Sequence, residues 1–154
     1  MSATHAVTTN GRIHSELKPA SGSLRDQIQG RLQRLDAAER YSLGLWALPP
    51  GVAFDDVDLD AWPQEFLQAA GSADRMTVEL RMIDAGLARQ FVVGRAPLTD
   101  GAPADQEVFW DGFRETVRPA EVFTWAEAID VFWTYCQSDE VGHPWVLREV
   151  SLEG

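Results

Sequence analysis

The chain has few of the residues from which a disulfide framework, a metal centre or a nucleophilic site is built. Cys136 is the only cysteine among 154 residues, which excludes an internal disulfide and a thiolate-rich metal site. The only histidines are His5, His14 and His143, and none belongs to a recognisable nucleophile–base motif. We therefore expect no catalytic residue, no metal ion and no cofactor, and a buried, inert thiol at Cys136.

Long apolar segments are also missing. The apolar runs are far shorter than the roughly 20 residues that a membrane-spanning helix needs. Residues 1–10 lack the basic patch and the apolar region of a signal peptide. These two absences predict no membrane partner and a cytoplasmic location.

Lysine is nearly absent too, because Lys18 is the only one, and the net charge is −11. Residues 1–48 have a net charge of +2, so the remainder of the chain carries −13. Such a surface repels phosphate backbones, which argues against direct binding of nucleic acid. It would attract a basic protein and accelerate the encounter, or it would serve solubility alone.

One loop concentrates this negative charge. Residues 52–62 resemble the opening of a calcium loop, but counting from Asp56 the required Gly and Glu positions hold Ala61 and Leu67. A calcium site is therefore excluded, and the loop is either solvated or a surface for a partner. The partner-binding candidates in this loop are Asp55, Asp56, Asp58, Asp60 and Trp62.

Tryptophan is abundant, with 6 residues. Trp46, Trp125 and Trp133 belong to apolar patterns and are expected in the core. Trp62 and Trp110 lie beside acidic residues, as interface anchors do; the alternative for each is a half-buried position at the edge of the core. Further partner-binding candidates are Glu107, Trp110, Asp111, Asp139 and Glu140.

The order of elements predicts an α+β fold. Hairpins are expected at Asn10-Gly11, Asp84-Ala85-Gly86 and Asp111-Gly112, with single strands at 41–48 and 145–151. Ser23 and Thr124 are expected to cap two helices, the second through a Thr124–Glu127 capping box, and Pro63 to begin a short helix over 63–70. Residues 96–106 are expected to form an exposed loop. We predict a single domain over 1–154 in which an antiparallel sheet of about five to six strands packs against two main helices, with residues 1–20 forming a hairpin or a loose arm.

The second half of the chain resembles a known family. Residues 89–94 read Arg-Gln-Phe-Val-Val-Gly at the end of the middle hairpin, and residues 119–123 form a Pro-x-Glu-Val-Phe step into the capped helix. A final strand follows near Trp145. Over roughly residues 75–151 this pattern resembles the immunity proteins of bacterial polymorphic toxin systems, some of which accompany nucleic-acid deaminase toxins of actinobacteria.

The resemblance implies an antitoxin that binds a cognate toxin domain, possibly a deaminase or nuclease with a basic surface, and blocks its active site. The alternative is a small α+β enzyme or ligand-binding domain with a pocket between sheet and helix. Composition, periodicity and spacing do not decide between these two functions.

Overall fold

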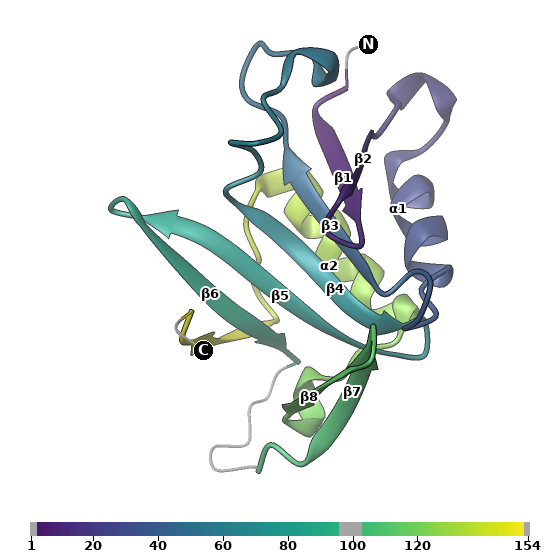
Figure 1. Cartoon of the computed structure of the whole chain (residues 1–154), viewed down its shortest axis with the longest axis vertical. Helices are drawn as coiled ribbons and strands as arrows, with labels where there is room; N and C mark the ends of the chain where they lie inside the picture. Colours follow the sequence, from purple (N-terminus) through teal and green to yellow (C-terminus); the bar gives the residue numbers. More distant parts are fainter. Residues whose placement is uncertain (1–2, 96–102, 153–154) are drawn as a thin grey trace.

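The computed structural model describes residues 3–95 and 103–152. One seven-stranded sheet, the large sheet, has the strand order β2-β1-β3-β4-β5-β6-β9, and β7 and β8 form a separate two-stranded sheet (Figure 1). All strand pairs are antiparallel. The strands are β1 (His5–Thr9), β2 (Ile13–Glu16), β3 (Ser42–Ala47), β4 (Phe66–Ser72), β5 (Arg75–Asp84), β6 (Leu87–Gly94), β7 (Gln106–Trp110), β8 (Phe113–Val117) and β9 (Val146–Val150); the helices are α1 (Leu24–Gln33) and α2 (Trp125–Ser138), with short 3-10 helices η1 (Pro19–Ser21), η2 (Phe54–Asp56) and η3 (Pro119–Glu121).

The predicted hairpins are confirmed, and their turns have the expected backbone geometry. A type I′ turn needs two consecutive residues with positive φ, which Asn and Gly adopt more easily than other residues. Each of the three tight turns has such a pair at its tip: Asn10 (57°) and Gly11 (70°), Ala85 (51°) and Gly86 (82°), and Asp111 (48°) and Gly112 (78°). The first twenty residues therefore contain a hairpin that belongs to the large sheet.

Both predicted helix caps are confirmed. The Ser23 hydroxyl accepts a hydrogen bond from the Asp26 N–H at the start of α1. At the start of α2, the Thr124 hydroxyl accepts from the Glu127 N–H, and the Glu127 carboxylate accepts from the Thr124 N–H at 3.0 Å. This reciprocal pair satisfies two N–H groups that a helix terminus would otherwise leave unpaired. No helix in the described part of the chain is both long and apolar enough to cross a bilayer.

The predicted short helix at residues 63–70 is wrong, because this segment enters strand β4. It pairs with β3 on one side and β5 on the other, so its backbone groups gain partners along both edges. That pairing outweighs the weak strand propensity of Ala69, Ala70 and Gly71. With β4 and the first hairpin included, the α+β class is confirmed, but the large sheet has seven strands where five to six were predicted.

The two faces of the large sheet are covered differently. On the helix face, α1 and α2 enclose the main hydrophobic core, which includes Leu45, Leu67, Val78 and Phe132. On the opposite face, here called the open face, a smaller cluster around Trp46 lies beneath the β3–β4 connection. A third cluster joins the β7–β8 hairpin to Val92 of β6. The middle of the open face is covered by neither.

Gly71 determines how closely the β7–β8 hairpin approaches the sheet. Its φ is +133°, and a Cβ there would lie 2.4 Å from the Arg75 carbonyl oxygen and 3.0 Å from a Val108 methyl group.

Gly71→Ala should therefore destabilise the fold by about 2 kcal/mol or more, measured by urea denaturation. Gly30→Ala is the matched control, because Gly30 is in α1 with open space around it. The control should gain about 1 kcal/mol, and equal effects of the two substitutions would contradict this geometry.

Candidate functional site

The predicted acidic loop lies where β3 leads into β4. Asp55 and Asp56 belong to η2, and Asp58 accepts a hydrogen bond from the Asp60 N–H. The apolar residues of the loop point the other way: Phe54, Val57 and Trp62 pack against the cluster of Trp46 and Leu48. Trp62 is thus half-buried at the edge of this cluster, while Leu59 remains 39% exposed among the aspartates.

The predicted turn at Asp139 and Glu140 lies at the same end of the molecule. Asp139 ends α2 in the left-handed conformation, with a φ of 59°. Its carboxylate is 3.3 Å from Nε2 of His5, whose Nδ1 is 3.0 Å from the Thr4 hydroxyl. The pKa of the Tyr135 phenol is raised, first by burial and then by the charges of two carboxylates. These belong to Asp139 and to Glu65, which directly precedes β4. We call this region the acidic end and define it as Asp55, Asp56, Asp58, Asp60, Glu65, Asp139 and Glu140.

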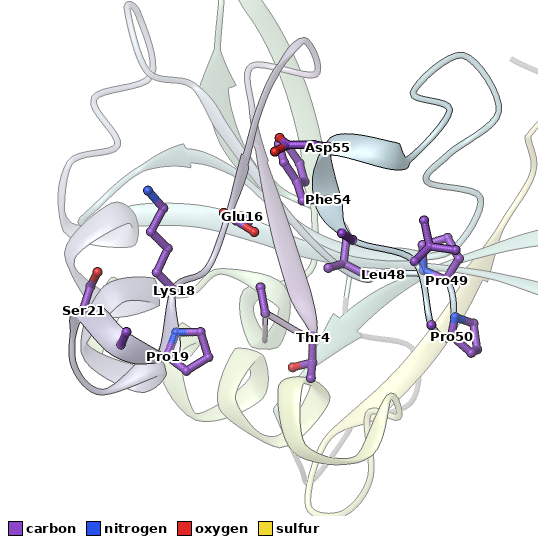
Figure 2. A pocket seen from close by; sticks show the side chains of 15 residues that line it. Thr4, Glu16, Lys18, Pro19, Ser21, Leu48, Pro49, Pro50, Phe54 and Asp55 are labelled. Atoms are coloured by element: carbon purple, nitrogen blue, oxygen red, sulfur yellow. The ribbon is translucent and has the colours of Figure 1, made fainter. Parts of the chain in front are cut away.

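An open pocket of about 780 Å³ lies beside the acidic end (Figure 2). The segment of Lys18 and Pro19 forms one side and the Pro49–Pro50 turn with η2 forms the other, with Thr4 at the base. Its charged lining residues are Glu16, Lys18 and Asp55, and most of the others are apolar or proline. Thr4 and Asp55 line the same pocket, which connects the acidic loop to the His5–Asp139 contact.

The third predicted group is far from the acidic end, on the β7–β8 hairpin. Trp110 stacks on Tyr41 with ring centroids 6.0 Å apart and contacts Phe113 at 5.2 Å. The Asp111 N–H donates to the Ala37 carbonyl, which attaches the hairpin tip to the segment before β3. Glu107 forms an exposed ion pair with Arg114. The ten predicted partner-binding residues therefore form two separate groups at opposite ends of β3.

Sequence reasoning did not predict a row of cross-strand neighbours on the open face, here called the polar row because five of its seven residues are polar. Strand register makes successive cross-strand neighbours of residues from seven strands: His14, Thr8, Gly44, Gln68, Glu79, Val92 and Arg148. The alternation of Glu79 and Arg81 with apolar residues indicates only that these two side chains share one face of their strand. Finding the row requires the strand order and register, neither of which the sequence provides.

Two carboxyl groups meet where the β7–β8 hairpin covers this row. Glu115 of β8 lies within hydrogen-bonding reach of Glu79 of β5. Gln90 donates to Glu79 at 2.7 Å, and the Thr77 hydroxyl donates to Glu115 at 3.4 Å. Burial, and then the neighbouring Glu115 carboxylate, raise the pKa of Glu79 to about 8, against the opposing effects of Gln90 and Arg148. The raised pKa favours the protonated form of Glu79 near neutral pH, at the interface between the hairpin and the large sheet.

Arg148 continues the row into a buried ion pair. Its guanidinium group donates to both carboxylate oxygens of Glu121 at 2.8 Å, and Glu121 is only 1% exposed. The two parallel bonds fix the orientation of both side chains, and Glu121 also accepts from the Arg118 N–H. The pair joins η3 to the edge strand β9.

Other chemically reactive side chains are placed as structural groups. Cys136 is buried in the main core, and burial, followed by the nearby Asp139 carboxylate, raises its thiol pKa to about 11. The thiol is therefore protonated at neutral pH, as a core cysteine should be. Among residues 3–95 and 103–152, no cluster of three or more His, Cys, Asp or Glu side chains is arranged to hold a metal ion.

Searches against family models, curated proteins and solved structures found no match to this chain.

The Glu79–Glu115 pair predicts a particular pH dependence of stability. The pKa of Glu79 is about 8 in the fold, against an ordinary value of 4.5, so the folded state holds a proton that the unfolded state releases. The contribution of the Glu79 carboxyl to the free energy of unfolding is fully present below pH 4.5 and is lost as the pH rises to about 8. Glu79→Gln, which keeps a hydrogen-bond donor without a titrating proton, should match the native protein near pH 5 and be more stable above pH 8.

Urea denaturation at several pH values measures this effect. Glu39→Gln, at an exposed position far from the pair, is the control and should keep the native profile. If Glu79→Gln shows the same decline between pH 5 and 8 as the native protein, the decline does not come from a raised pKa of Glu79.

Proposed function

We propose that this chain is an immunity protein that binds a cognate bacterial toxin domain through its acidic end and blocks the toxin's active site. The class of partner comes from the resemblance of residues 75–151 to immunity proteins. The observation that carries the choice of surface is the unneutralised charge of the acidic end.

Five of the chain's cations are paired away from the acidic end, and Lys18, which lines the same pocket as Asp55, forms no ion pair with it in the described structure. Arg25, Arg89, Arg95, Arg114 and Arg148 form ion pairs with acidic residues outside the acidic end. In the described part of the chain, no aspartate of residues 55–60 takes part in an ion pair, and the sequence has no Lys or Arg from 41 to 74. The aspartates therefore face solvent with their charge uncompensated.

Such a surface complements a protein that handles nucleic acid. A toxin that cuts or edits nucleic acid needs positive charge to hold phosphates, and an acidic protein can occupy that surface in place of the substrate. Charge would mainly accelerate association, while a few desolvated apolar contacts would slow dissociation. Leu59 and the edge of Trp62 are the apolar groups that the loop offers for this second role.

Neutralising the loop should slow association. The variant Asp55→Asn, Asp56→Asn, Asp60→Asn keeps Asp58, which supports the loop backbone. Its association rate with the toxin domain should fall several-fold, with a weaker dependence on salt. The toxin to use is the product of the gene directly upstream, and surface-binding kinetics at two ionic strengths measure the effect.

A matched control separates local from overall charge. Glu39→Gln, Asp74→Asn, Asp105→Asn makes the same change in net charge with three exposed residues at the opposite end of the strands. It should slow association much less. Equal slowing by both variants would mean that only net charge matters, and absence of a complex would reject the proposal.

Leu59→Ala tests the apolar contact. Because Leu59 is exposed within a loop, its truncation should leave the stability of the fold nearly unchanged. If the loop enters the interface, the dissociation rate should rise, with co-expressed toxin then inhibiting growth more strongly. An unchanged dissociation rate would place the apolar contact elsewhere, with Trp62 as the next residue to test.

A further inference from the structure

The uncovered middle of the open face contains a second pocket, which the proposed function does not use. Its volume is about 240 Å³, and it lies over β1, β3 and β4 beside the first hairpin. The walls are largely apolar, and the polar side chains come from four separate segments. The lining residues are Thr8, Gly11, His14, Ser42, Gly44, Trp46, Pro63, Phe66 and Gln68.

A hydrogen-bond chain orients one wall. The Trp46 indole N–H donates to the Thr8 hydroxyl at 2.9 Å, and this hydroxyl lies 2.8 Å from Nδ1 of His14. Since the hydroxyl already accepts from Trp46, its own proton is best placed on Nδ1, which leaves the neutral imidazole with its N–H at Nε2. That N–H has no hydrogen-bond partner among the described residues.

Two further polar groups at the pocket are unused. The side chains of Gln68 and Ser42 form no hydrogen bond within the described structure, although Ser42 is only 4% exposed. An amide and a hydroxyl each offer a donor and an acceptor. The pocket therefore combines apolar walls with a few convergent polar groups, which is the usual composition of a small-molecule site.

Gly44 keeps the base of this pocket free. It is the one residue of the polar row in β3, and a Cβ built there would meet only Thr8, at 3.8 Å. The backbone is not in the left-handed region, so a larger side chain would fit the strand and project into the pocket. A cavity of about 150 Å³ accommodates a benzene ring, so the space above Gly44 is large enough for a ring with one substituent.

We propose that this pocket binds a small, uncharged planar ring that carries an amide-like edge, with a donor and an acceptor side by side. The apolar walls contact the ring, and Gln68 with Ser42 or His14 pairs with the edge. An anionic ligand is disfavoured because the whole chain carries −11. None of the residues that define the acidic end lines this site, and the proposal does not depend on the toxin proposal.

Benzamide is the probe, with toluene as the ring without the edge and benzoate as the charged analogue. A fragment of this size should bind with a dissociation constant on the order of millimolar. In a ¹H–¹⁵N NMR titration, benzamide should shift the amide signals of Thr8, Gly44 and Gln68, and should bind several-fold more tightly than toluene or benzoate. Equal binding of toluene would overturn recognition of the edge, and no binding of benzamide would overturn the site.

Two variants locate the binding. Gly44→Val fills the pocket and should abolish the shifts, whereas Gly142→Val, in open space away from it, should leave them unchanged. Gln68→Leu keeps the wall but removes the amide, and should reduce benzamide binding to the level of toluene. Benzamide binding that survives Gly44→Val in a folded protein would show that it occurs elsewhere.

Discussion

The rest of this structure depends on one constraint, which is that the two faces of the large sheet are covered differently. An antiparallel strand directs alternate side chains to opposite faces, so every strand that buries leucine or valine against α1 and α2 presents a second set of residues on the other side. With both helices on one face, that second set must be covered by something else or remain polar. The open face uses both solutions: other segments cover the apolar clusters of Trp46 and Val92, and most of the remaining positions of the polar row hold polar residues.

The two segments that cover the open face also contribute charged side chains to it. The β3–β4 connection seals the Trp46 cluster with its apolar residues, which leaves its aspartates directed to solvent. The β7–β8 hairpin covers Val92 with Val108 and Val117, and this packing places Glu115 next to Glu79. The apolar packing of each segment therefore determines the position of its charged side chains. In the β3–β4 connection the aspartates are exposed to solvent, whereas in the β7–β8 hairpin Glu115 is held against the sheet.

How much of this the sequence could predict depends on the range of the interactions. The Thr124 cap and the three turns at Asn10-Gly11, Ala85-Gly86 and Asp111-Gly112 depend on neighbours within four residues, and these predictions were confirmed. Strand β4 was missed because its conformation is imposed by the strands on either side. The Glu79–Glu115 pair and the pocket over Gly44 depend on which strands are adjacent and in what register. Local patterns hold no information on those two properties.

In the described part of the chain, the acidic residues that pair with arginines and the aspartates of residues 55–60, which form no ion pair, lie in different parts of the molecule. Arg89 pairs with Asp84 and Glu149, and Arg148 pairs with the buried Glu121, so these arginines compensate acids that the sheet edge and the core require. At physiological salt, fields are screened within about 8 Å, which means that distant arginines cannot compensate the loop. The four aspartates fall within the six residues 55–60, so each lies next to another aspartate in the chain or is separated from one by a single residue. A screened field of this kind acts at short range, so the acidic end would accelerate association by orienting a basic partner during the last step of its approach.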